Sequence, residues 1–322
     1  MSFKRSKSGA AEKTLSPQEQ QDKIGEVRKI LGPIVDKFTA LCSDASILRY
    51  LRARNYNTKK AAKMLKSTIK WRLEFRPEKI QWDDVAQEAK KGGLYKADYL
   101  DKQGRIVFVI RPGIQSTNSS AMQIKYLIYC LENAIWNLSS NQEQMVWLID
   151  FQGWSSSCVS LKVTREAAQV LQAHYPERLA LAIFYNPPKV FESFWTMVKP
   201  FLEPKTYRKV IFVYPNNPMS RKVMEEHLDM DKLEVYFGGK NTVGFNYEAY
   251  AQRMKADDKN MSDVFDSCCS SPGFMNSEIH ESVLSGTIDS EDEASSDEAV
   301  SPKIPCSQYE PNEVHVHEPK LT

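Results

Sequence analysis

The sequence has no apolar run long enough to cross a bilayer. Its longest apolar segment, residues 179–185, is far shorter than the roughly 20 residues that a membrane-spanning helix needs. The first residues, MSFKRSKSGAAEK, are basic and lead into no apolar core of a secretory signal. These absences predict a cytoplasmic chain whose six cysteines stay reduced. The cysteines also lack the paired spacing of metal ligands, so we expect no metal site.

Motifs of the common enzyme classes are missing as well. No G-x-G-x-x-G or G-x-x-x-x-G-K-[ST] loop is present to cradle a nucleotide phosphate. The stretch GWSSSCVS lacks the G-x-S-x-G pattern, no H-E-x-x-H helix occurs, and the region expected to fold contains only His174 and His227. An aromatic RNA-binding signature is absent too. We therefore expect no enzyme, no cofactor and no nucleic-acid partner.

Charge is divided unevenly along the chain. The formal net charge is +2, but residues from Ser262 onward carry 13 acidic and 2 basic side chains, a net of −11, which leaves +13 on residues 1–261. A basic body attracts anionic surfaces, and an acidic tail in the same chain can compete for it. Low hydrophobicity predicts disorder for a basic N-terminus, residues 1–22, and for an acidic tail, residues 259–322. Ser290, Ser295 and Ser296 stand in an acidic setting that resembles sites of acidophilic kinases.

Helical periodicity dominates residues 23–80. In TKKAAKMLKSTIKWRLEF, Ala62, Leu65, Ile69 and Leu73 form one apolar stripe beneath a basic face. Gly32 and Pro33 are expected to break an earlier helix. The pattern predicts an N-terminal helical bundle.

From residue 88 to 258, apolar runs alternate with helical segments. The runs RIVFVIRPG, MVWLIDFQGW, LALAIFYNPP and KVIFVYPNN are nearly continuous in apolar residues, which indicates strands buried on both faces. Helices between such strands imply parallel pairing. The fold class is therefore α/β, with the helical bundle packed on a mostly parallel sheet.

An aromatic segment follows the double proline at residues 187–188. Apolar side chains cover well over half the circumference of a helix spanning residues 190–202. Such a helix needs two apolar neighbours. The sheet supplies one, and the residues alone leave open whether the second is more protein core or a lipid.

Four motifs in order give the sequence a family resemblance. LRYLRARNYNTKKAAKMLKSTIKWR, HYPERLALAIFYNPP, the aromatic segment with KPFLEPKTYRKVIF, and FGGK together resemble the CRAL-TRIO lipid-binding family, in particular its phosphatidylinositol transfer branch. The likeness extends from about Cys42 to Lys240. It implies a lipid pocket above the sheet, closed by a helical gate that opens at membranes.

The resemblance also assigns roles to individual residues. It implies that the gate is Lys189 to Leu202, with Gly238 and Gly239 as its hinge. The gate side chains it implies are Val190, Phe191, Phe194, Trp195, Val198, Phe201 and Leu202. The implied headgroup ligands are Arg54, Glu177, Arg178, Thr206 and Lys209, a set with charge for a phosphate, a hydroxyl donor and an acceptor for inositol hydroxyls.

Two positions depart from the family pattern. Members that also carry phosphatidylcholine have small hydroxyl side chains where this chain has Met145 and Trp147. The second lipid therefore stays open among phosphatidylcholine held differently, a sterol and another apolar molecule. A tryptophan in the pocket would also shorten or reshape the space for acyl chains.

The sequence thus predicts a monomeric, peripheral lipid-exchange protein whose ligand is a bound phospholipid. Its expected partners are phosphatidylinositol, anionic membrane surfaces and phosphoinositide kinases. One alternative is a carrier of a nonphosphorylated hydrophobe resembling tocopherol, a retinoid or a sterol. Another is an α/β hydrolase or phosphatase with a degenerate motif.

Overall fold

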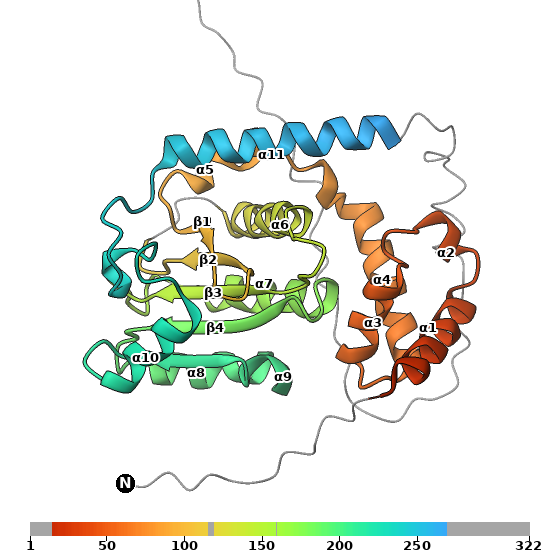
Figure 1. Cartoon of the computed structure of the whole chain (residues 1–322), viewed down its shortest axis with the longest axis horizontal. Coiled ribbons are helices and arrows are strands. Elements are labelled where there is room, and N and C mark those ends of the chain that lie inside the picture. Colours follow the sequence, from red (N-terminus) through yellow and green to blue (C-terminus); the bar gives the residue numbers. More distant parts are fainter. Residues whose placement is uncertain (1–14, 115–118, 159, 269–322) are drawn as a thin grey trace, which may run out of the picture.

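The structure is a computed structural model that describes residues 15–114, 119–158 and 160–268, without the side chains of 263–268. Figure 1 shows the N-terminal helices gathered at one end of the molecule beside a twisted sheet. The long C-terminal helix α11 runs along one edge of this sheet. The two parts correspond to the helical bundle and the α/β unit that the sequence predicts.

The helical bundle consists of α1 (Pro17–Leu31), α2 (Ile34–Lys37), α3 (Asp44–Ala53) and α4 (Thr58–Phe75). Gly32 ends α1, which confirms the predicted break. The hydroxyl of Ser16 accepts from the Glu19 amide, and the Glu19 carboxylate accepts from the Ser16 amide, which fixes the helix start. Residues 17–22 are therefore helical, so the disordered N-terminus predicted to reach residue 22 was placed too far along the chain.

The α/β unit is built on five strands in the order β1-β2-β3-β4-β5. They are β1 (Leu94–Leu100), β2 (Ile106–Ile110), β3 (Met145–Asp150), β4 (Leu179–Tyr185) and β5 (Val210–Val213). Strands β2 to β5 pair in parallel, as the apolar runs predicted. The edge strand β1 is antiparallel to β2. It is absent from the predicted strands because LYKADYL interrupts its apolar residues with Lys96 and Asp98.

Helices α6 (Ser120–Trp136), α7 (Leu161–His174) and α8 (Phe191–Val198) border a cavity on one face of the sheet. Met145, Trp147 and Ile149 of β3 face this cavity, because alternate strand residues point to opposite faces. Val146 and Leu148 point the other way into the main core. The remaining elements are η1 (Pro77–Lys79), α5 (Trp82–Ala89), η2 (Lys199–Phe201), α9 (Pro204–Tyr207), α10 (Pro218–His227), η3 (Val235–Phe237) and α11 (Tyr247–Cys268).

The bundle and the sheet unit meet through stacked rings and a buried ion pair. The indole of Trp71 lies parallel to the imidazole of His174, with centroids 4.2 Å apart. Arg72 donates to both carboxylate oxygens of Glu132, at 2.8 and 2.9 Å. Burial alone would raise the pKa of Glu132, but Arg72 outweighs it and the pKa is lowered. This specific pairing fixes how the bundle sits on the sheet.

Two carboxylates fasten α11 to the rest of the molecule. Asp257 accepts from the buried ammonium of Lys96 at 2.8 Å, and Asp258 accepts from the Trp82 amide at 2.6 Å. The helix continues to Cys268, so residues 259–268 are helical although the sequence predicted a disordered tail from residue 259. The rest of that predicted tail lies outside the described residues. Among the described helices, none is both long and apolar enough to traverse a bilayer.

Candidate functional site

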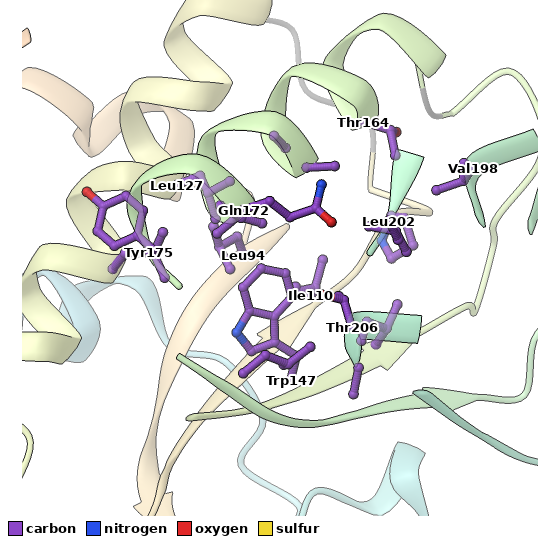
Figure 2. A pocket seen from close by; sticks show the side chains of 18 of the residues that line it. Leu94, Ile110, Leu127, Trp147, Thr164, Gln172, Tyr175, Val198, Leu202 and Thr206 are labelled. Atoms are coloured by element: carbon purple, nitrogen blue, oxygen red, sulfur yellow. The ribbon is translucent and has the colours of Figure 1, made fainter. Parts of the chain in front are cut away.

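A cavity of about 450 Å³ lies between the sheet and helices α6 to α8. Its walls are largely apolar. Figure 2 shows the indole of Trp147 rising from the sheet toward α7, with Gln172 and Leu202 beyond it. Apolar residues on the walls include Ile110, Leu127, Met145, Ala182, Phe184 and Leu202. Trp147 pairs with Ala182 across β3 and β4, so the indole lies beside a small side chain. Trp147 is the largest side chain that the sheet contributes to the cavity.

Charged and hydroxyl side chains gather where the loop before β4 meets α9. We call this set the polar end of the cavity, and it consists of Glu177, Arg178, Glu203, Lys205, Thr206 and Lys209. Glu177 has a positive φ of 59°, which turns the chain into β4. The ammonium of Lys209 lies 3.3 Å from a Glu177 carboxylate oxygen and donates to the Leu179 carbonyl at 2.8 Å. Acceptors and donors of opposite charge are therefore combined in one place.

Through Glu143, Arg178 also connects the polar end with basic residues of α3. It donates to the backbone carbonyl of Glu143 at 2.9 Å. The Glu143 carboxylate receives Arg49 at 2.8 Å and Arg52 at 3.1 Å, both from α3. Burial and the nearby charge of Arg49 lower the pKa of Arg178 to about 10. The polar end thus lies in a strongly positive surrounding where the bundle meets the sheet.

Four of the five predicted headgroup ligands line this cavity together, namely Glu177, Arg178, Thr206 and Lys209. Arg54 is not among the cavity-lining residues of the described chain, although its neighbour Ala53 is. Its guanidinium donates to a Glu203 carboxylate oxygen at 3.0 Å and to the Ala53 carbonyl at 3.2 Å. Arg54 is therefore separated from the cavity by Glu203, and the role of each of the five stays a prediction.

The predicted gate is shorter and more divided than a single helix over residues 190–202. It forms α8, followed by the 3₁₀ turn η2 at Pro200, which supplies no amide donor. Phe191, Phe194 and Val198 are buried in an aromatic cluster with Phe151 and Trp154. Trp195, Val198 and Leu202 line the cavity, while Val190 and Phe201 are exposed. One face of the segment therefore packs as core and another borders the cavity, and contact with a lipid stays a prediction.

The two glycines of the predicted hinge have different structural requirements. Gly238 ends η3 in the left-handed region, with φ of 83°. Gly239 lies so close to the Leu233 carbonyl that a Cβ would overlap its oxygen. These constraints account for both glycines by backbone conformation and space, and hinge motion stays a prediction.

Several residues of the site were missed by sequence reasoning. Glu203, Lys205 and Gln172 line the cavity and connect it to neighbouring helices. Glu203 and Lys205 fall inside the quoted motif KPFLEPKTYRK, between the gate and Thr206, so their position was a usable signal. Gln172 carries no such signal, because a glutamine within an amphipathic helix is an ordinary surface residue.

Comparison with known proteins agrees with this architecture. The CRAL/TRIO domain model matches residues 90–239, and the CRAL/TRIO N-terminal domain model matches residues 28–67. A CRAL-TRIO domain-containing protein of Schizosaccharomyces pombe is 33% identical over 205 residues, covering 63% of this chain and 19% of that protein. The phosphatidylinositol transfer protein PDR17 of Saccharomyces cerevisiae is 30% identical over 241 residues, covering 70% of this chain and 66% of that protein.

Another relative and a solved structure are also similar to this chain. The SEC14 cytosolic factor of Eremothecium gossypii is 29% identical over 246 residues, covering 70% of this chain and 78% of that protein. Among solved structures, the crystal structure of Sfh5 superposes with a TM-score of 0.58 at 16% identity, covering 74% of this chain and 92% of that chain. The structural match supports the fold, and the two domain models cover the bundle and the sheet. The chain therefore belongs to the CRAL-TRIO domain family, with its N-terminal CRAL/TRIO domain in the helical bundle and its CRAL/TRIO domain around the sheet.

Proposed function

We propose that this chain binds phosphatidylinositol in its cavity and exchanges or presents the lipid at membranes. The observation that carries this proposal is the combination of apolar walls with one charged end that contains Glu177, Thr206 and Lys209. The name of the relative PDR17 supports it, since that protein is called a phosphatidylinositol transfer protein. Presentation to phosphoinositide kinases and a cytoplasmic, peripheral location are parts of the same proposal.

The chemistry of the polar end suits an inositol phospholipid. Lys209 supplies a positive charge to the phosphate, and the Thr206 hydroxyl donates to its oxygens. Glu177 accepts from inositol hydroxyls, which a choline headgroup lacks. The apolar walls take the acyl chains, whose transfer from water is favourable by about 0.8 kcal/mol for each buried CH₂ group. A ligand that is apolar at one end and anionic at the other satisfies both regions.

We propose no covalent chemistry for this cavity. Its lining within the described residues contains no histidine to serve as a general base. His174 ends α7 and is buried, with its ring stacked on Trp71 of α4. The gate would open by separating α8 from the aromatic cluster, and the lipid would then leave with its acyl chains toward the bilayer.

A second hydrophobic ligand is favoured by the sheet wall. Met145 and Trp147 line the cavity and offer no hydroxyl to a choline phosphate. A nonphosphorylated apolar molecule of sterol or tocopherol type would need neither group. We therefore propose that phosphatidylinositol shares the cavity, in alternation, with such a molecule.

Identification of the bound lipids tests the proposed ligand directly. The full-length protein would be purified, extracted with organic solvent, and its lipids identified by mass spectrometry. We expect phosphatidylinositol to be enriched over its share of the host lipids. A protein that carries only nonphosphorylated hydrophobes after exposure to phosphatidylinositol vesicles would show that the headgroup assignment is wrong.

The variant Lys209→Gln tests the role of the polar end. Loss of a charge-assisted hydrogen bond costs about 1.5–3 kcal/mol, so phosphatidylinositol transfer between vesicles should fall by about one to two decades. The control is Lys162→Gln, which removes a largely exposed lysine of α7. Both proteins should melt within a few degrees of the wild type. Equal transfer by Lys209→Gln and Lys162→Gln would contradict the assignment.

A further inference from the structure

The C-terminal end of the gate is fastened to α7 by one amide side chain. The Gln172 amide nitrogen donates to the Phe201 carbonyl at 2.7 Å, and its oxygen accepts from the Glu203 amide at 2.5 Å. Phe201 ends η2 and Glu203 immediately precedes α9, so the two bonds hold the segment of residues 201–203. This segment leads directly into Thr206 and Lys209, so its position also sets the geometry of the polar end.

The same segment is fastened to the helical bundle by charge. Glu203 pairs with Arg54, the C-cap residue of α3, at 3.0 Å. Lys205 donates to the Arg52 carbonyl at 2.7 Å. The Arg54 and Glu203 side chains are 24% and 39% exposed, so water screens their attraction only partly. The end of the gate therefore depends on a contact between two separate parts of the molecule.

Glu203 lies between Arg54 and the cavity. Glu203 lines the cavity, whereas Arg54 does not, and the guanidinium is directed at the carboxylate. Arg54 Nη1 donates to both the Glu203 carboxylate and the Ala53 carbonyl, so a ligand phosphate that binds this nitrogen competes with Glu203 for it. Once displaced, Glu203 no longer contributes its ion pair to holding the gate end on the bundle, and the Lys205 bond to the Arg52 carbonyl remains. Binding of an anionic headgroup and binding of the Glu203 carboxylate are thus alternatives for the Arg54 guanidinium.

We propose that Glu203 is a latch residue, and that a headgroup phosphate frees the gate end by replacing Glu203 on Arg54. This inference rests on the proposed function, because it needs a phosphate-bearing ligand in the cavity. It assigns Glu203 a positioning role in exchange. It also predicts a selectivity: a hydrophobe without a phosphate has no group that can displace Glu203, so it leaves the latch closed.

The variants Glu203→Gln and Arg54→Gln test the latch, since each breaks the ion pair and keeps a polar side chain. Glutamine matches Glu203 in size and is shorter than Arg54. The first readout is amide hydrogen exchange of residues 191–207 in delipidated full-length protein. Exposed ion pairs contribute up to about a factor of five in an equilibrium, so exchange should rise about two- to fivefold in both variants. The control Glu225→Gln breaks the exposed Arg221–Glu225 pair on α10 and should leave the gate unchanged.

The second readout is uptake of phosphatidylinositol from vesicles, where the two variants should differ in sign. Glu203→Gln leaves Arg54 free for the phosphate, so uptake should rise about two- to fivefold. Arg54→Gln removes the cation, so uptake should fall about tenfold. A merely structural contact would move both variants in the same direction.

The outcomes separate this proposal from the proposed function. Unchanged hydrogen exchange in both variants, or uptake that shifts in the same direction in both, would overturn the latch. Wild-type protein that takes up no phosphatidylinositol would overturn the proposed ligand, and the latch mechanism with it, whatever the hydrogen exchange shows. Faster exchange together with opposite uptake effects supports both.

Discussion

The basic residues around the polar end already have partners in this structure. Lys209 is paired with Glu177, Arg54 with Glu203, and Arg178 with the Glu143 carbonyl. A headgroup that binds here must exchange with these partners, so the net gain from each contact is smaller than its gross strength. Selectivity then arises from differences between partners. In the proposed complex, inositol hydroxyls would give Glu177 a new donor when Lys209 turned to the phosphate, whereas a headgroup without hydroxyls would leave that carboxylate uncompensated.

At the same scale, His174 makes stability depend on pH. Burial and the charge of Arg72 lower its pKa from 6.5 to about 3 in the folded protein. The unfolded chain gains a proton as the pH falls below about 6.5, while the folded chain does not, so folding stability is lost toward low pH. At pH 5 this loss amounts to about 2 kcal/mol relative to neutral pH.

The variant His174→Phe should remove this pH dependence, because phenylalanine keeps a ring against Trp71 and cannot titrate. Urea unfolding at pH 7.5 and pH 5 would measure the free energy of unfolding of both proteins. The wild type should lose about 2 kcal/mol more than the variant between the two pH values. The hydrogen-bonding contact with Thr68 at 3.3 Å is lost at both values and cancels in the comparison. Parallel losses would show that His174 is protonated in the folded protein.

At the scale of elements, the predicted gate has two faces that differ in their exposure to water. Phe191, Phe194 and Val198 are buried, whereas Val190 and Met197 are 59% and 50% exposed. Phe194→Ala should therefore lower the free energy of unfolding by about 3–5 kcal/mol. The double variant Val190→Ser and Met197→Ser should change it by less than about 1 kcal/mol, because both side chains lie largely in water.

The exposed face should instead matter at membranes, where apolar side chains enter the interface. Sedimentation with vesicles should show about tenfold weaker binding for the double serine variant. Val243→Ser is the matched control, since Val243 is 79% exposed outside the gate. If the control and the double variant sediment equally with vesicles, the exposed gate face does not dock on lipid.

The two glycines after η3 allow the cost of an unfavourable backbone conformation to be compared with the cost of a steric clash. Gly238→Ala places a side chain at φ of 83°, which costs about 1–2 kcal/mol, while its Cβ meets only the Tyr185 hydroxyl at 3.5 Å. Gly239→Ala would force a Cβ into the Leu233 carbonyl, so it should cost about 3 kcal/mol or more. Thermal melting should show the larger drop for Gly239→Ala. A larger drop for Gly238→Ala would mean that backbone conformation is the stricter requirement.

Local patterns predicted most elements and missed those that depend on distant residues. Strands β2 to β5 were recognisable because each is an apolar run buried on both sides. Strand β1 was not, because the buried Lys96 is partnered by Asn133 of α6 and by Asp257, which lies far along the chain on α11. Aromatic density predicted a helix over residues 190–202, but its division into α8 and η2 was not predicted.

For the whole molecule, the polar end could be predicted only in part. Thr206 and Lys209 are close in sequence, and the motif order brought Glu177 to them. The sequence near Arg54 does not indicate that Glu203 lines the cavity and pairs with Arg54, while Arg54 itself does not line it. Likewise, Glu143 joins Arg49 and Arg52 across more than 90 residues. Such pairings are set by how the bundle docks on the sheet, and that arrangement exists only in the folded chain.

At the scale of the whole molecule, residues 1–268 carry a net positive charge and residues 269–322 a net negative charge. Helix α11 extends to Cys268, so a truncation that keeps this helix complete must be made after Cys268 and not at the predicted boundary of residue 259. Residues 269–322 carry 11 acidic and 2 basic side chains, a net of −9, which leaves +11 on residues 1–268. Because the acidic segment and the basic body are joined in one chain, each meets the other at a high effective concentration. We therefore expect the acidic segment to compete with anionic lipids for the basic body.

Truncation after Cys268 tests this competition while keeping α11 complete. Without residues 269–322, binding to anionic vesicles should increase at low ionic strength, because the basic body loses its internal competitor. The Debye length shrinks from about 30 Å at 0.01 M salt to about 8 Å at 0.15 M, so the difference between the two proteins should narrow as salt is added. Neutral vesicles provide the control, since both proteins should bind them equally. Equal binding of full-length and truncated protein to anionic vesicles at low salt would refute the competition, because attraction between −9 and +11 is strongest under that condition.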